Sequence, residues 1–243
     1  MTRSTIALRL VAQAGKRIVN AHPKRQFLKH LATLGLLGSS GIPGLITQAL
    51  ASGGTPARPG IQKISGAVTL NGKVAQQGAL VRAGDTLVTG PDSTAIYVIG
   101  QDAFLQREKT TVSLAIDPSG AVAGALRVVT GKLLSVFARG NRQIETATAT
   151  IGIRGTGCYI ECEDQRVYFC LCYGSAEIRP LADPQRVERL VTSHHDRPVY
   201  IHRDSALPVM ADAGMINHQD AELELVEGLV GRVPPFSKGS YRY

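Results

Sequence analysis

The stretch GCYIECEDQRVYFCLCY, residues 157–173, decides the fold of this chain. Two runs of alternating character flank the polar residues Glu163 to Arg166, and this pattern predicts two strands joined by a tight turn. A turn of two or four residues gives one set of opposed residues: Cys162 with Val167, Ile160 with Phe169, and Cys158 with Leu171. We expect this register because it gathers the strongest apolar side chains on one face, which burial selects.

A second register stays open for the same two strands. A three-residue loop, Asp164 to Arg166, would reverse the parity and set Cys158 opposite Cys172, where a disulfide becomes possible. In the preferred register, Cys158 and Cys162 are small core residues, whereas Cys170 and Cys172 lie on the opposite face. The residues predicted to share that opposite face are Tyr159, Glu161 and Tyr168.

Short apolar or β-branched runs extend outward from this hairpin, from Gly66 to about Arg179, and each is closed by Gly, Pro, Asn or Asp. The runs are Val68 to Leu70, Leu87 to Val88, Ala95 to Ile99, one ending at Asp117-Pro118-Ser119-Gly120, Leu126 to Val129, and Leu133 to Phe137. Runs of this length and spacing predict an all-β fold. We expect a short-stranded β-sandwich, a roll or a short solenoid.

A helical pattern follows the strands near the end of the chain. Asn217 with Asp220 three residues later indicates a helix start, and Leu223, Val226 and Val230 recur on one helical face. Gly231 and Pro234-Pro235 would end the helix. We therefore expect a C-terminal helix of about three turns packed on the sheet.

The charge of the chain is concentrated in its first 51 residues. These hold seven Lys or Arg residues and no Asp or Glu, so the remainder keeps 20 of the 27 basic residues and all 19 acidic ones. The formal charge of +8 therefore belongs to the leader, and the remainder is close to neutral. This balance argues against nucleic acid as a partner.

The leader resembles an export signal. Lys24-Arg25-Gln26-Phe27-Leu28-Lys29 is similar to a twin-arginine motif with lysine at the first position, and a mildly apolar stretch follows from Leu31 to Leu50. Glycines and Pro43 interrupt that stretch, so it is no membrane-spanning helix. Ala49-Leu50-Ala51 predicts cleavage before Ser52 and delivery to the periplasm, with an N-terminal amphipathic helix as the alternative.

The expected organisation of the chain follows from these patterns. We expect a signal segment at 1–51, a linker at 52–63, the β domain at 64–179, and a C-terminal extension with the short helix at 180–243. No transmembrane helix is expected after cleavage.

Three segments carry a family resemblance. GAVTLNG (66–72), GDTLVTG (84–90) and TATIGIRGTG (148–157) resemble successive landmarks of the FecR domain, over roughly Ile64 to Arg179. The resemblance implies a periplasmic β domain of cell-surface signalling, which senses an outer-membrane transporter and controls a sigma factor. Family members carry a cytoplasmic anti-sigma segment ahead of a membrane helix, and Met1 to Gln26 is too short for one. We therefore expect a free sensing module that binds a periplasmic or envelope protein.

The third landmark has a physical interpretation of its own. Gly152, Gly155 and Gly157 permit a tight turn between strands with close backbone approach. Strand-like sequence on both sides argues against a phosphate-binding loop. Arg154 at the centre is a candidate for binding an acidic partner, although an arginine in such a turn more often binds nearby carbonyls.

The cysteines and histidines supply the candidate chemistry. Four cysteines lie within fifteen residues, followed by His194-His195-Asp196, His202 and His218. Two disulfides are one interpretation in an oxidising compartment. The other is a metal or redox site made of Cys170, Cys172, His194 and His195, in which a bend near Gly174 brings both sulfurs to one zinc or copper ion.

Two further interpretations of these residues are a purely structural role and a catalytic role. His194-His195-Asp196 could form only a polar turn before Pro198, with the cysteines purely structural. No Gly-x-Ser-x-Gly, His-Glu-x-x-His or Walker sequence is present, and a nucleophilic pair such as Cys170 with His194 lacks an indicated pocket. We therefore expect a binding protein and not an enzyme.

Overall fold

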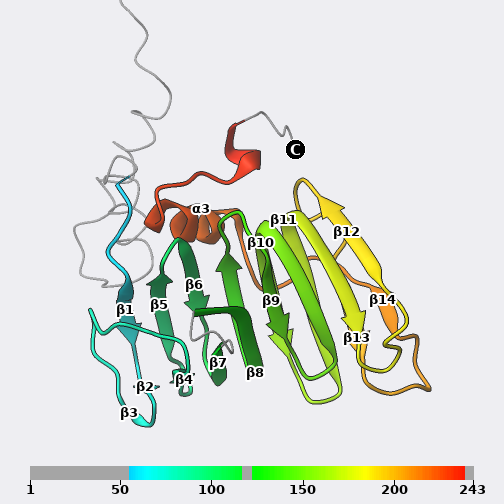
Figure 1. The fold of residues 1–243 in the computed structure, drawn as a ribbon, viewed down its shortest axis with the longest axis horizontal. Coiled ribbons are helices and arrows are strands. Elements are labelled where there is room, and N and C mark those ends of the chain that lie inside the picture. The colour runs from blue at the N-terminus through cyan, green and yellow to red at the C-terminus, as the bar shows by residue number, and fades with distance from the viewer. Residues whose placement is uncertain (1–54, 117–121, 239–243) are drawn as a thin grey trace, which may run out of the picture. The chain divides into compact units, whose positions relative to one another are not determined.

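The computed structural model describes residues 55–116 and 122–238, and the regular elements of this part of the chain are almost all strands (Figure 1). The strands are β1 (Gly60–Ser65), β2 (Val68–Leu70), β3 (Lys73–Val74), β4 (Thr86–Thr89), β5 (Thr94–Ile99), β6 (Asp102–Gln106), β7 (Thr110–Ile116), β8 (Val122–Val136), β9 (Arg142–Glu145), β10 (Ala149–Cys162), β11 (Arg166–Pro180), β12 (Glu188–Thr192), β13 (Val199–His202) and β14 (Met210–Asp212). One helix, α3 (Asp220–Leu229), and a 3-10 turn, η1 (Pro235–Lys238), follow. The expected leader and the turn at 117–120 lie outside the described residues.

The strands form one branched, open sheet, which confirms the all-β prediction. Its main path runs β14-β13-β11-β10-β9-β8-β7-β4-β2-β3, while β1, β5, β6 and β12 branch from it. All described pairings are antiparallel except the one between β8 and β9. Antiparallel pairing of this kind argues against a parallel solenoid.

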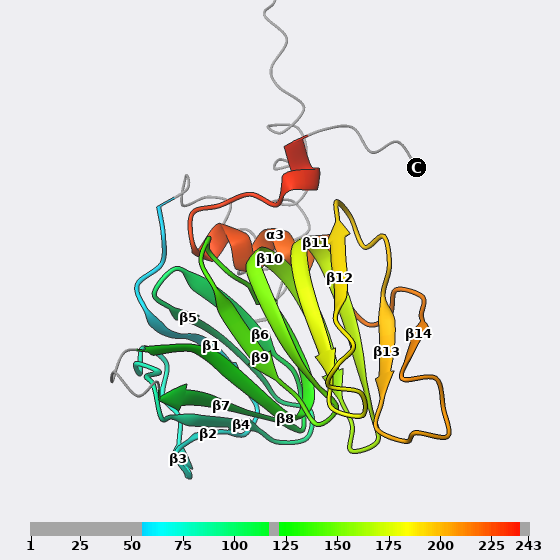
Figure 2. The same cartoon turned by 45° about the vertical axis from the view of Figure 1, so that its right-hand side comes forward.

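The three longest strands change partners along their length. The first part of β10 pairs with β9 and its second part with β8, whereas β11 pairs first with β13 and then with β12 (Figure 2). Apolar residues from both halves of these strands belong to one core cluster. The sheet therefore bends over a single core.

Glycines mark the bends. In β11 the core residues are Val167, Phe169 and Leu171 before Gly174 but Ala176 and Ile178 after it, so the inward parity changes at the glycine. Gly174 has a φ of +97°, which a side chain would strain. Such an irregularity keeps the apolar face inside on both sides of the bend.

Two sequence expectations are wrong at the other bends. The predicted turn at Gly152 to Gly157 is an irregularity inside β10, with register shifts on both sides of Gly157. Likewise the runs at 126–129 and 133–137 are not separate strands, because β8 passes through Gly131 at a φ of +89°. A glycine at positive φ suits a bulge within a strand as well as a turn.

The central hairpin has the preferred register. Cys162 lies opposite Val167, Ile160 opposite Phe169 and Cys158 opposite Leu171. The Glu163 amide donates a hydrogen bond of 3.0 Å to the Arg166 carbonyl, which closes the turn. The alternative register, with Cys158 opposite Cys172, is wrong, and all four cysteines are free.

The β domain is longer than the sequence indicated. β1 begins at Gly60, inside the expected linker, since it pairs with β5 from Gly60 opposite Val98. β12, β13 and β14 lie in the expected C-terminal extension and yet belong to the sheet, through β11. Residues 180–212 are therefore part of the β domain.

The predicted helix is present, with a different start. Asn217 has a φ of +55° and cannot cap a helix, so α3 begins at Asp220 after Gln219, whose amide donates to the Glu222 carboxylate at 3.0 Å. Leu223 and Val226 are buried. α3 packs on β6 and β8. Among the described residues no helix is long and apolar enough to cross a membrane.

Candidate functional site

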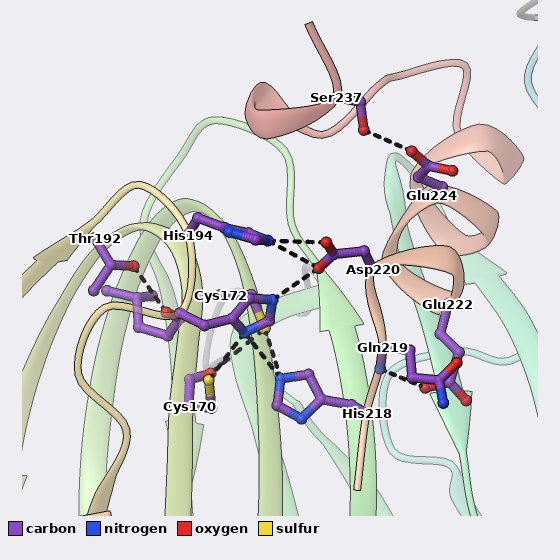
Figure 3. Close-up of polar contacts among 12 residues, drawn as sticks. Cys170, Cys172, Thr192, His194, His218, Gln219, Asp220, Glu222, Glu224 and Ser237 are labelled. Atoms are coloured by element: carbon purple, nitrogen blue, oxygen red, sulfur yellow. Dashed lines mark hydrogen bonds and ion pairs between the residues drawn. The ribbon is translucent and has the colours of Figure 1, made fainter. Parts of the chain in front are cut away.

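Four side chains meet beneath the N-terminus of α3 (Figure 3). Cys170 and Cys172 come from β11, His195 from the turn after β12, and His218 from the segment before α3. All four side chains are buried, and their four donor atoms lie within 4.8 Å of one another. The set is Cys₂His₂.

The local backbone brings these residues together. Alternation along β11 points both cysteines to the face away from the main core, as the sequence predicted. The turn after β12 is attached to β11, because the Thr192 hydroxyl donates to the Leu171 carbonyl at 2.8 Å and the His195 amide to the Cys172 carbonyl at 2.9 Å. His195 itself has a φ of +52°, a conformation that a sheet residue would not adopt.

The distances between the sulfur and nitrogen atoms of the cluster are close to those between the ligands of a tetrahedral metal ion. Cys170 Sγ lies 3.3 Å from His195 Nδ1, and Cys172 Sγ lies 3.6 Å from His218 Nε2. The two nitrogens, His195 Nδ1 and His218 Nε2, are 3.1 Å apart. A tetrahedral zinc ion with bonds of about 2.3 Å to sulfur and about 2.0–2.1 Å to nitrogen separates its ligand atoms by about 3.3–3.8 Å.

The outer nitrogens of the two imidazoles fix their tautomers. His218 Nδ1 lies 2.6 Å from the Ile216 carbonyl, which can only accept, so Nδ1 carries the proton. His195 Nε2 lies 3.2 Å from an Asp220 carboxylate oxygen, which also only accepts. In the neutral histidines both inward nitrogens therefore present lone pairs to the centre of the cluster.

Electrostatics make the cluster attractive to a cation. The hydrogen bond from Cys172 and those from His195 and His218 outweigh burial and hold the pKa of Cys170 well below its usual range. Burial raises the pKa of Cys172, so that thiol donates to its neighbour. Burial alone would lower the pKa of His195, but its bonds to Cys170 and Asp220 raise it. A buried thiolate beside imidazoles is a soft anionic centre.

Cys158 and Cys162 show the contrast. Both belong to the core cluster, as the sequence predicted, and burial raises the pKa of each thiol. A thiol with a raised pKa in apolar surroundings is inert. The two cysteines of β10 are therefore core residues, and those of β11 belong to the polar cluster.

From the sequence we expected His194 to join the two cysteines. In the structure it is not a member of the Cys₂His₂ cluster and contacts Asp220, the carboxylate that binds His195. His194 Nε2 lies 3.0 Å from both carboxylate oxygens of Asp220, and its ring packs on Phe236 at 4.5 Å. Together His194, His195 and Asp220 form a second, partly exposed group. The residue that joins Cys170, Cys172 and His195 is His218, whose sequence signal was a histidine directly before a helix start.

Arg154 is exposed on β10. Within the part of the chain that the structure describes, its guanidinium has no hydrogen bond or ion pair, so it does not bind nearby carbonyls as expected of a turn arginine. A role in partner binding stays a prediction.

Two of the FecR-like landmarks contact each other. The Asn71 amide group donates to Asp85 Oδ1 at 2.7 Å, and its oxygen accepts from the Thr86 amide at 2.9 Å. Asn71 and Gly72 both have positive φ and make the turn between β2 and β3. These landmark residues build turns of the fold, and the third landmark builds the bend of β10.

Comparison with known proteins gives distant likenesses. Two solved structures from Parabacteroides distasonis, each described as a "putative anti-sigma factor", are similar to this chain. The first is 16% identical, covers 55% of this chain and 57% of its own length, and has a TM-score of 0.37. The second is 15% identical, covers 60% and 59% respectively, and has a TM-score of 0.32. The chain thus spans less than two thirds of each.

No protein-family profile and no curated protein matches the sequence. At TM-scores this low, the two structures carry no argument about function. The assignment of function therefore rests on the geometry of the cluster.

Proposed function

We propose that this chain is a metal-binding protein that holds one zinc ion between Cys170, Cys172, His195 and His218. The observation that carries the proposal is the convergence of two sulfurs and two imidazole nitrogens, which belong to buried side chains and lie within 4.8 Å of one another. When the histidines are neutral and their outer nitrogens are protonated, their inner nitrogens can both bind a metal ion at this centre.

Zinc fits this donor set better than other common metals. Two thiolates and two imidazoles are a typical set for structural zinc, and Mg²⁺ or Ca²⁺ prefers oxygen ligands. The separations of 3.1, 3.3 and 3.6 Å between ligand atoms are close to the edge lengths of a zinc tetrahedron. Copper(I) also accepts thiolates and is the second metal to test.

The surroundings of the histidines support a metal role. Ile216 accepts from the outer nitrogen of His218, and Asp220 accepts from that of His195. Zinc-binding histidines usually donate their second N–H to a carbonyl or a carboxylate, which fixes the ring and increases its basicity. Since the protein supplies all four ligands, the site is closed and structural, which favours a binding protein over an enzyme.

The wider role we propose is that of an exported sensing or partner-binding module in the periplasm. The twin-arginine-like leader and the FecR-like landmarks support this setting. In it, the zinc ion would stabilise a β domain whose partner is an envelope protein. Affinity capture with the mature protein from a periplasmic extract, followed by mass spectrometry, tests whether one envelope protein is enriched.

Metal analysis of the purified exported protein tests the zinc site directly. We expect about one zinc per chain, and none in a Cys170→Ser/Cys172→Ser variant. The matched control is Cys158→Ser/Cys162→Ser, which removes two cysteines from the neighbouring strand and should keep the metal. Equal zinc in the first variant and the unchanged protein would refute the site, and copper in place of zinc would correct the metal.

A further inference from the structure

The ligands of the proposed site come from two separate parts of the molecule. Cys170, Cys172 and His195 belong to the sheet and its turns, whereas His218 lies on the C-terminal segment, residues 213–229, which leads from β14 into α3. The outer nitrogen of His218 bonds to Ile216, within that same segment. The inner nitrogen faces Cys172 and His195, across the boundary between segment and sheet.

The start of α3 is tied to the same point. Asp220, the first residue of the helix, accepts a hydrogen bond from His194 (Figure 3) and another from His195, and both histidines lie in the turn after β12. An acidic residue in the first turn also suits the positive end of the helix. The ligand His218 and the carboxylate of Asp220 therefore hold one short stretch against the sheet.

The segment covers an apolar surface. Leu223, Val226 and Leu229 of α3 are buried, and the helix packs on β6 and β8. On those strands Leu105 lies opposite Leu134, and both are fully buried although neither belongs to the main core cluster. Departure of α3 would expose these leucines to water, at a cost in free energy.

Other polar links also cross the boundary. The Tyr173 hydroxyl bonds to Glu227 of α3, and both residues are buried. The Tyr168 hydroxyl donates to the Gly214 carbonyl at 3.0 Å, and Arg107 binds Glu222 at 2.7 Å. None of these links involves the four cluster residues, so a change in the segment on chelation reports what the ion adds to them.

We infer that the metal ion acts as a clasp: its presence fixes the C-terminal segment, residues 213–229, on the sheet, and its loss loosens that segment selectively. The inference rests on the proposed zinc site. Full binding of the metal ion requires His218 to lie against the sheet. The free energy of metal binding therefore also stabilises the docked position of the segment that carries His218. The apolar surface under α3 is then covered when zinc is bound and becomes accessible to solvent when zinc is lost.

Hydrogen exchange measured by mass spectrometry, on the whole exported protein, tests the clasp. We expect peptides from residues 213–229 to exchange at least tenfold faster after zinc is removed with a chelator. Peptides from the β10–β11 hairpin should keep their protection, because their hydrogen bonds do not depend on the segment. Re-addition of zinc should restore the slow exchange.

A variant of His218 tests whether this ligand is needed to hold the segment when zinc is present. His218→Ala leaves three ligands on the sheet, so it should still bind zinc weakly but exchange fast in residues 213–229 even with zinc present. His202→Ala is the matched control, since the His202 imidazole lies 2.7 Å from the Pro208 carbonyl and His202 is not a member of the cluster. It should behave like the unchanged protein, and preserved hairpin protection in both variants shows that they fold.

The outcomes distinguish the clasp from the site. Absence of bound zinc would overturn the site itself. Stoichiometric zinc with equal exchange in residues 213–229, with and without chelator, would overturn the clasp and leave the site standing. Loss of protection throughout the domain on chelation would also overturn the clasp, because the ion would then stabilise the whole fold.

Discussion

Ile160 and Phe169 lie directly opposite each other where β10 pairs with β11, and both side chains are fully buried. We expect Phe169→Ala to lower the free energy of unfolding by about 3–5 kcal/mol, because it removes a large aromatic ring from the core. Urea denaturation followed by circular dichroism measures the loss. The control is Val191→Ala on β12, where the side chain is 81% exposed and the change should stay within about 0.5 kcal/mol. A loss below about 1 kcal/mol for Phe169→Ala would contradict the burial of this ring.

Asp220 should tune the metal through His195. Asp220→Asn keeps a hydrogen-bond acceptor but removes the charge that faces His195 Nε2, so we expect zinc affinity to fall by about 10–100-fold. Competition with a chromophoric chelator measures the affinity.

His194→Ala is the control for the Asp220 variant, since His194 contacts the same carboxylate but is not one of the four residues of the Cys₂His₂ cluster. Its effect should be several-fold smaller. Complete loss of zinc in His194→Ala, with zinc retained in His218→Ala, would instead support the ligand set expected from the sequence.

Gly174 should tolerate no side chain. Its φ is +97°, and a Cβ atom there would lie 2.7 Å from Thr156 Cγ2 and 2.9 Å from the Gly155 carbonyl. We expect Gly174→Ala to destabilise the domain by about 2 kcal/mol or more, from backbone strain together with the clash. Gly78→Ala separates the two causes, because Gly78 also has positive φ but open space around it, and its cost should be about 1 kcal/mol. Equal costs would mean that the β11 bend is loosely packed.

The mature chain should begin at Ser52. Ala49 and Ala51 are the small residues that signal peptidase requires at the cleavage site, and these positions lie outside the described residues. Intact-mass spectrometry of the exported protein checks the prediction. A periplasm-facing protein that still carries Met1 would indicate a leader that remains as a membrane tether.

The local features of the fold were predictable, because they depend on neighbours in the sequence. The alternation in residues 157–173 favoured the observed hairpin register over the alternative, and with it the face of each cysteine, and Asn71-Gly72 indicated a tight turn. The bends were not predictable in the same way. Gly131 and Gly174 look alike whether a strand ends or bends there, and only the pairing partners on each side distinguish the two cases.

The candidate site was predictable only in part. Both cysteines were indicated by their shared face, but His218 lies 46 residues after Cys172, and no sequence period connects them. His194 and His195 are adjacent, and the left-handed backbone of His195 decides which of them faces the sulfurs. That conformation depends on the attachment of the turn to β11, which the sequence does not encode locally.

The β10–β11 hairpin also has a consequence for the order of folding. Its strands are consecutive and joined by a tight turn, so its contacts are local and should form early. The pairing of β1 with β5 and the packing of α3 on β6 and β8 join residues further apart in the sequence, so these contacts should form later. The early hairpin already presents Cys170 and Cys172 side by side, and His195 follows them along the chain. We therefore expect a nascent domain to capture its ion with two sulfurs and one nitrogen, and His218 to complete the set as the last step of folding.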